Sequence, residues 1–221
     1  MPLPLTTITF PEIRLAPRDA HKLRGYFGTV FQERSPLLHN HYADGALRYK
    51  YPLVQYKVVG GVPTLVAIGE GAQLLTGLFL EVKELNIDGK HFPVYNKNIV
   101  GKQVEIGVDG ALHRYCFESR WMALNQENYR QYIGAATDQR KTMLNRILVG
   151  NMLSFFKGVN ILLKPEERIM ADLRFTPKEV QFKDQKMIAF EGEFTANVML
   201  PDLIGLGKSV SRGFGCIRKI A

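Results

Sequence analysis

The order of strand-like and helix-like segments in the first 88 residues restricts the fold more than any other feature of this sequence. Residues 5–15 alternate threonine with isoleucine, as a strand does, and Pro17 opens a segment with apolar residues three or four positions apart, as in a helix. A Gly60-Gly61 pair then marks the turn of a hairpin. The expected elements are a strand at 5–15, a helix at 17–30, strands at 48–59 and 62–69, a helix at 69–82 and a strand at 81–88. This order is that of a ferredoxin-like domain.

The second half of the chain also mixes strands with helix. We expect one hairpin over residues 102–124 that turns at Asp109-Gly110, and another over 180–200 that turns near Asp184. Between them, segment 138–157 carries an apolar stripe at helical spacing, made by Leu144, Leu148, Met152 and Phe155. The sequence therefore predicts a second α+β domain, and we place the boundary between residues 92 and 93.

The composition favours a globular protein with a polyanionic partner. The chain has 221 residues, of which 46% are hydrophobic, and its formal net charge is +8, a balance that favours nucleic acid. The apolar runs are too short to span a membrane, and we expect no secretion signal at the N-terminus. Cys116 and Cys216 have no CxxC spacing, so we expect free thiols and a cytoplasmic location.

The segment 205–220, GLGKSVSRGFGCIRKI, is rich in glycine and cations. It is not a nucleotide-binding loop of either common type, because Asp202 and Val210 stand where those motifs require glycine. Two interpretations follow, a tight turn between strands or a loop whose backbone N–H groups approach phosphates closely. The residues of this segment that could contact phosphates are Gly205, Gly207, Lys208, Ser209, Arg212, Gly213 and Gly215, and these become the candidate RNA-binding residues under the resemblance that follows.

The same segment resembles the glycine-rich C-terminal signature of the CRISPR repeat-processing endoribonucleases, which belong to the repeat-associated mysterious protein superfamily. LRGYFG, LLHNHYADGALRYKYPLVQYKVV and IGEGAQLLTGLF are similar to the N-terminal region of one branch of that family. The resemblance implies an α+β protein of two tandem ferredoxin-like domains, residues 1–92 with a histidine site and 93–221 with the glycine-rich loop. It also implies CRISPR repeat RNA as partner, with Arg140 and Lys141 as further RNA contacts.

Two histidines, His39 and His41, lie two positions apart in a polar segment ahead of a basic, tyrosine-rich run. Cleavage of RNA by its own 2′-hydroxyl needs a base and an acid, and histidine can serve as either near neutral pH. In extended chain the two side chains point the same way, with Cα atoms roughly 7 Å apart. Arg48 and Lys50 could stabilise charge on the phosphate. We therefore expect these four residues to form the catalytic site.

A metal site at the histidine pair is the main chemical alternative. Zinc needs a third and a fourth ligand, and Asp44 is the only carboxylate nearby in sequence. We therefore expect neither a metal nor another cofactor. His21, in the first helix, is a reserve catalytic candidate, whereas we interpret His91 and His113 as structural or surface residues.

The expected activity is metal-independent cleavage of CRISPR precursor RNA within its repeats, leaving 5′-hydroxyl and 2′,3′-cyclic phosphate ends. A non-catalytic RNA-binding subunit of a CRISPR effector complex is the alternative, and a basic protein with no nucleic-acid role is a weaker one. The resemblance leaves open a homodimer and an association with an effector complex.

Overall fold

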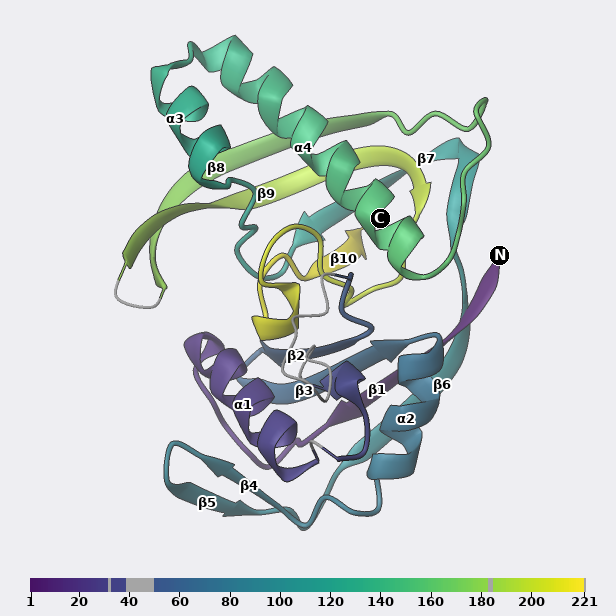
Figure 1. Cartoon of the computed structure of the whole chain (residues 1–221), viewed down its shortest axis with the longest axis vertical. Coiled ribbons are helices and arrows are strands. Elements are labelled where there is room, and N and C mark those ends of the chain that lie inside the picture. The colour runs from purple at the N-terminus through teal and green to yellow at the C-terminus, as the bar shows by residue number, and fades with distance from the viewer. Residues whose placement is uncertain (32, 39–49, 183–184, 221) are drawn as a thin grey trace. The chain divides into compact units, whose positions relative to one another are not determined.

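The computed structural model describes residues 1–31, 33–38, 50–182 and 185–220 (Figure 1). The chain divides into two compact units. The first comprises Met1–Glu105 with Val210–Gly213, and the second comprises Ile106–Ser209 with the residues from Phe214 onward. The C-terminal glycine-rich segment therefore contributes four residues to the first unit.

The first unit is a ferredoxin-like domain, as the sequence predicts. Its sheet has the order β2-β3-β1-β6, and all neighbouring strands are antiparallel. Its elements are β1 (Pro2–Thr9), η1 (Pro17–Asp19), α1 (Ala20–Val30), η2 (Pro36–Leu38), β2 (Val54–Val59), β3 (Val62–Ile68), α2 (Glu70–Leu78), β4 (Glu84–Ile87), β5 (Lys90–Pro93) and β6 (Asn98–Glu105). Gly60 and Gly61 both have positive φ and form the turn between β2 and β3, as expected.

The fourth strand of this sheet is not the one that the sequence predicts. Segment 81–88 contains β4, which pairs only with β5 in a two-stranded hairpin. The sheet is completed by β6, which pairs with β1 from Pro2↔Glu105 to Thr9↔Asn98. Because β6 is paired along the whole of β1, the first unit continues to Glu105 rather than ending at residue 92.

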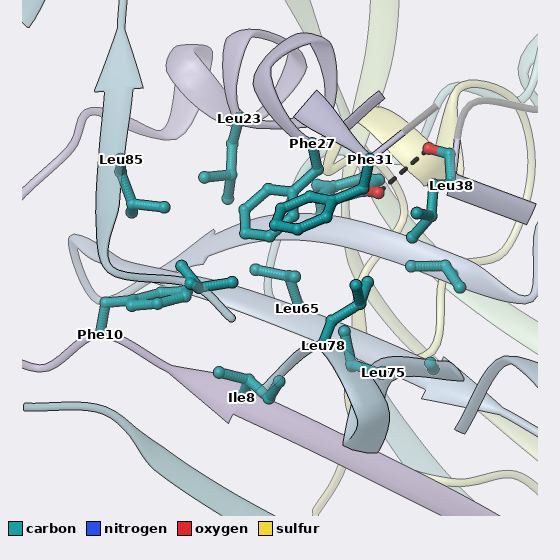
Figure 2. Close-up of a cluster of buried hydrophobic side chains, with 14 of the residues drawn as sticks. Ile8, Phe10, Leu23, Phe27, Phe31, Leu38, Leu65, Leu75, Leu78 and Leu85 are labelled. Carbon is teal, nitrogen blue, oxygen red and sulfur yellow. Dashed lines mark hydrogen bonds between the residues drawn. The ribbon is translucent and has the colours of Figure 1, made fainter. Parts of the chain in front are cut away.

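One hydrophobic core holds α1 and α2 on the same face of the sheet (Figure 2). Leu23 and Phe27 of α1 and Leu75 and Leu78 of α2 are at most 2% exposed. They pack against strand residues that include Ile8, Phe10, Tyr56 and Leu65. The apolar face predicted for α1 is confirmed over its first two turns, whereas Val30 is 53% exposed.

The sheet of the second unit has the same strand order as the sheet of the first unit, but a different arrangement of helices covers it. Its sheet runs β10-β7-β9-β8, and α4 lies across it (Figure 1). Its elements are β7 (Gly107–Phe117), α3 (Gln126–Gly134), α4 (Thr137–Gly158), β8 (Ala171–Phe182), β9 (Gln185–Met199) and β10 (Ile217–Ile220). In the first half of the chain, the helix α2 follows the third strand, β3. At the corresponding place in the second half, between β9 and β10, lies the glycine-rich segment with its short helix η3 (Val210–Arg212).

The hairpin expected at Asp109-Gly110 is wrong, because β7 continues through both residues. The register against β9 shifts between Val108 and His113, so the Asp-Gly pair lies at an irregularity within one strand. The Asp109 carboxylate accepts a hydrogen bond from the Ala111 N–H at 2.8 Å and binds Nε2 of His113 at 2.8 Å. These contacts fix the irregularity locally without a chain reversal.

The other expectations for this half are confirmed. The helix predicted at 138–157 is α4, and its four stripe residues are fully buried. β8 and β9 pair as far as Phe182↔Gln185, so the predicted antiparallel pair is confirmed, whereas Asp184, where we expect the turn, lies outside the described residues. The helix α3 was not predicted. It begins after Asn125, whose side chain accepts a hydrogen bond from the Asn128 N–H.

Among the described residues, no helix is both long and apolar enough to cross a membrane. Cys116 and Cys216 are free thiols, as expected.

Candidate active site

Two described segments flank residues 39–49, and both are held by β2. Leu38 ends the first segment and is 1% exposed, and its carbonyl accepts a hydrogen bond from the Tyr56 hydroxyl at 3.0 Å, the dashed line in Figure 2. The second segment begins at the exposed Lys50, and Gln55 Nε2 donates to the Tyr51 hydroxyl at 2.7 Å. The predicted catalytic residues His39, His41 and Arg48 lie outside the described residues, and the structure fixes the chain immediately before them.

The glycine-rich segment reaches this part of the first unit through η3. Gly213, directly after η3, has a φ of +92°, which favours glycine. A Cβ built there would lie 2.6 Å from Cβ of Ala20 in α1 and 3.4 Å from the Tyr56 carbonyl oxygen in β2. The backbone at Gly213 therefore packs between α1 and β2, which a larger residue would prevent.

This packing brings positive side chains together. Arg24 in α1 and Arg212 in η3 are both half-buried. Burial lowers the pKa of the Arg24 guanidinium, and the nearby charge of Arg212 lowers it further. Burial also raises the pKa of the Tyr56 phenol, which keeps it protonated as the donor to Leu38. The result is a cationic surface close to the residue that precedes His39.

The remaining candidates of the glycine-rich segment lie in the second unit. At Gly207, with φ of +95°, a Cβ would lie 2.6 Å from Nε1 of Trp121, and at Gly215 it would clash with the Leu206 carbonyl oxygen. Gly205 is buried and bridges to Cys216. Close packing of the protein's own atoms therefore explains Gly207 and Gly215. From the sequence alone, this reason for a glycine cannot be told apart from contact with phosphate.

Two polar residues of the segment are more accessible than its glycines. Lys208 is exposed, and its N–H donates to the Met122 carbonyl at 2.9 Å, which fixes the backbone and leaves the ammonium group at the surface. Ser209 is half-buried and adopts a φ of +56°.

The two basic candidates on α4 have partners within the second unit. Arg140 donates to the carbonyl oxygens of Tyr132 and Ile133, both at 2.9 Å, and its guanidinium lies over the Tyr132 ring. It therefore caps the C-terminal end of α3. Lys141 forms an ion pair with Asp172 at 2.7 Å.

The other histidines differ in their surroundings. His21 is exposed on α1, and its Nδ1 lies 2.6 Å from the Arg18 carbonyl oxygen. His91 is a surface residue beside Glu84, and His113 is paired with Asp109 in the β7 irregularity. In the part of the chain that the structure describes, no three His, Cys, Asp or Glu side chains are grouped to hold a metal ion.

A shallow hollow on the sheet of the second unit does not favour a polyanion. Its charged lining consists of Arg114, Arg174, Asp172 and Glu193. Arg114 binds Glu193 at 3.1 Å, and Arg174 lies 3.8 Å from the same carboxylate. The charges of this lining therefore balance, and the hollow offers a polyanion no net attraction.

Comparison with known proteins covers both units. The family model of the Cas6b N-terminal domain matches residues 1–105, and that of the Cas6b C-terminal domain matches residues 107–220. The chain belongs to the Cas6b family. These ranges also meet where the structure divides, after Glu105.

Solved structures agree with this membership of the Cas6b family. The chain is 34% identical to a crystal structure of Cas6b, with a TM-score of 0.94 and full coverage of both chains. It is 30% identical to a CRISPR RNA processing endoribonuclease, Cas6b, with a TM-score of 0.81 and full coverage of both. An uncharacterized protein of Methanocaldococcus jannaschii is 37% identical over 144 residues, which are 65% of this chain and 97% of the relative.

Arg24 is the residue of this Cas6b surface that the sequence did not reveal. It lies in the LRGYFG motif of the first helix, and nothing in the motif itself distinguishes this cation from the other basic residues of the helix. Arg24 lies one helical turn after Ala20, and this position indicates a neighbour of the glycine-rich segment only because Gly213 packs against Ala20 in the folded chain.

Proposed function

We propose that this chain is an endoribonuclease that cuts CRISPR precursor RNA within its repeats, without a metal ion, by attack of the 2′-hydroxyl on the adjacent phosphate. Membership of the Cas6b family over both domains carries the activity, because a fully covered, 30% identical member is a CRISPR RNA processing endoribonuclease. The similarity to an endoribonuclease also favours an enzyme over the non-catalytic subunit of an effector complex.

In the proposed mechanism, one of His39 and His41 takes the proton of the 2′-hydroxyl, and the other protonates the departing 5′-oxygen. Attack closes a 2′,3′-cyclic phosphate and releases a 5′-hydroxyl. Lys50, which is exposed at the far end of the same segment, and Arg48 would stabilise the negative charge that develops on the phosphate. The hydrogen bond from Tyr56 to Leu38 supports this assignment, because it anchors the chain one residue before His39.

RNA binding is assigned mainly to the glycine-rich segment. Its exposed Lys208 and its half-buried Ser209 and Arg212 would contact the phosphates, and its glycines would shape the loop. Arg140 and Lys141 on α4 remain proposed secondary contacts, although each has a partner within the protein. We also propose a cytoplasmic protein. Light scattering with and without repeat RNA separates a monomer from a homodimer, and co-purification reports association with an effector complex.

The test is cleavage of a labelled repeat RNA, taken from the CRISPR array of the same genome, in EDTA. The wild type should cut once within the repeat and leave a cyclic phosphate. His39→Ala and His41→Ala should still bind this RNA while losing at least about a hundredfold in cleavage rate. His91→Ala is the control, since its ring is 62% exposed beside Glu84 and outside this site.

Binding without cleavage by the wild type would favour the subunit and refute the enzyme. Normal cleavage by both loop variants together with an inactive His21→Ala would move the catalytic site to α1.

A further inference from the structure

Three of the four edge strands of the two four-stranded sheets are protected against pairing with another strand. In the first unit, Gly213 lies against β2, since a Cβ there would be 3.4 Å from the Tyr56 carbonyl oxygen. In the second unit, the edge strand β8 contains Pro177, which has no N–H to donate. The other edge strand, β10, is bonded to the segment before it, because the Leu203 N–H donates to the Ile217 carbonyl oxygen at 2.7 Å.

The fourth edge strand, β6, has no such protection in the part of the chain that the structure describes. Its eight residues pair with β1 in a continuous register, without proline or a bulge, and with no other strand. Val100 is 57% exposed and Ile99 is 36% exposed, and as neighbours in a strand they lie on opposite faces of the sheet. A long edge strand with exposed β-branched residues is a template for a further strand.

The register fixes which backbone groups of β6 point outward. The Pro4 carbonyl oxygen accepts a hydrogen bond from the Gly69 N–H at 2.9 Å, so the even-numbered residues of β1 direct their backbone groups to β3. The odd-numbered residues of β1 therefore direct theirs to β6, where they face its even-numbered residues. The N–H and carbonyl groups of Ile99, Gly101 and Gln103 consequently point away from β1.

The residues of β6 allow it to pair with a second copy of itself. Outward groups meet across an antiparallel two-fold axis if the axis lies at Val100, Gly101 or Lys102, near the middle of the strand. An axis at Lys102 would oppose two like charges. An axis at Gly101 pairs the whole strand and places Lys97 opposite Glu105 of the second copy, so that opposite charges meet at both ends. In this register Lys102 faces Val100 of the second copy and does not block the edge.

The two end residues have contacts within the chain and capacity for one more. Glu105 lies 3.2 Å from the N-terminal amino group, and its side chain is 60% exposed. Lys97 donates to the Val82 carbonyl oxygen at 2.6 Å, which uses one of the three N–H bonds of its ammonium group. Such partly exposed ion pairs add little stability, so their role is to select the register.

We propose that β6 is a self-association edge, through which two copies of the chain pair antiparallel about an axis at Gly101 and join their four-stranded sheets edge to edge. An interface made by one strand from each copy is small, below the about 1,200 Å² of a stable complex, so the dimer is weak. The proposed catalytic segment leads into β2, at the opposite end of the strand order. The proposal therefore does not depend on the proposed RNA cleavage.

The first experiment measures self-association of the full chain by sedimentation equilibrium over a concentration series without RNA. Val100→Lys places a lysine opposite Lys102 of the second copy at two symmetric positions, and should weaken self-association at least about tenfold. Adding Lys102→Glu to this variant restores opposite charges and should recover the dimer. Leu112→Lys is the matched control, because Leu112 is a 65% exposed apolar residue of the second unit.

Cysteine cross-linking tests the register. Val100 and Lys102 of the second copy would form a non-hydrogen-bonded pair with Cα atoms about 4.5 Å apart, which a disulfide can bridge. A mixture of Val100→Cys and Lys102→Cys proteins should therefore give a linked dimer on oxidation. Neither variant alone should do so, because the two equal positions would be about 8 Å apart. The wild type measures linkage through its own Cys116 and Cys216.

Each contrary result has a separate meaning. A wild type that stays monomeric at about 1 mM would overturn the proposal, since even a millimolar Kd gives a measurable dimer there. A dimer that Val100→Lys weakens no more than Leu112→Lys does would overturn β6 as its edge. Linkage in Val100→Cys alone or in Lys102→Cys alone would overturn the axis at Gly101. Thermal unfolding of each variant shows whether a lost dimer comes from misfolding, and recovery in the Val100→Lys, Lys102→Glu variant excludes that cause.

Discussion

Replacement of Gly213 by alanine tests how the glycine-rich segment is joined to the first unit. Two energetic terms follow from the geometry. An alanine at φ of +92° adopts a conformation that side chains disfavour by about 1–2 kcal/mol. Its Cβ would also lie 2.6 Å from Cβ of Ala20, an atom attached directly to the α1 backbone that cannot turn aside. Such overpacking costs about 1–3 kcal/mol.

Gly213→Ala should therefore lower the free energy of unfolding by about 2–5 kcal/mol, or displace η3 from α1 at a similar cost. Urea denaturation measures the loss of stability, and affinity for repeat RNA reports the displacement of Arg212. Gly101→Ala is the control, because a Cβ at Gly101 has no atom within 4 Å and φ there is not positive. It should change stability by less than about 1 kcal/mol.

A double-mutant cycle with Ala20→Gly divides the two terms. Removing the Ala20 methyl group relieves the overlap and leaves the backbone conformation unchanged, so the double variant should recover about 1–2 kcal/mol relative to additivity. Additive effects would show that the overlap does not contribute, and a Gly213→Ala protein as stable as Gly101→Ala would refute the whole argument.

Three further changes have defined outcomes. Tyr56→Phe removes the hydrogen bond to Leu38, which should lower the free energy of unfolding by about 1 kcal/mol in urea and slow repeat cleavage more than it weakens binding. The pKa of Asp109 is lowered by its hydrogen bond with His113, so its ionised form stabilises the fold above about pH 4 and this contribution is lost as the pH falls further. Asp109→Asn should therefore have a lower Tm than the wild type at pH 6, with the gap closing below pH 4, and a constant gap would contradict the sign. Arg140→Ala should destabilise the protein by about 1 kcal/mol through loss of the α3 cap, and no change in urea unfolding would contradict that role.

The sequence by itself determined those elements whose signal is local. The stripe of α4 from Leu144 to Phe155 and the Gly60-Gly61 turn both follow from the conformational preferences of neighbouring residues, and both are confirmed. The resemblance carried by the glycine-rich segment and the N-terminal motifs likewise indicated the family that both domains match. The histidine pair was found by its own spacing, and its role remains a prediction.

Only the tertiary structure decided which segments meet. β6 completes the first sheet because it pairs with β1 at the opposite end of the first unit's sequence. No pattern within β6 itself indicates which strand is its partner. Asp109-Gly110 has the composition of a turn, but pairing of β7 with β9 on both sides keeps the chain extended. Gly213 and Arg212 come to Ala20 and Arg24 through the packing of η3 on α1. Such contacts depend on the fit of backbones distant in sequence, which no short-range pattern encodes.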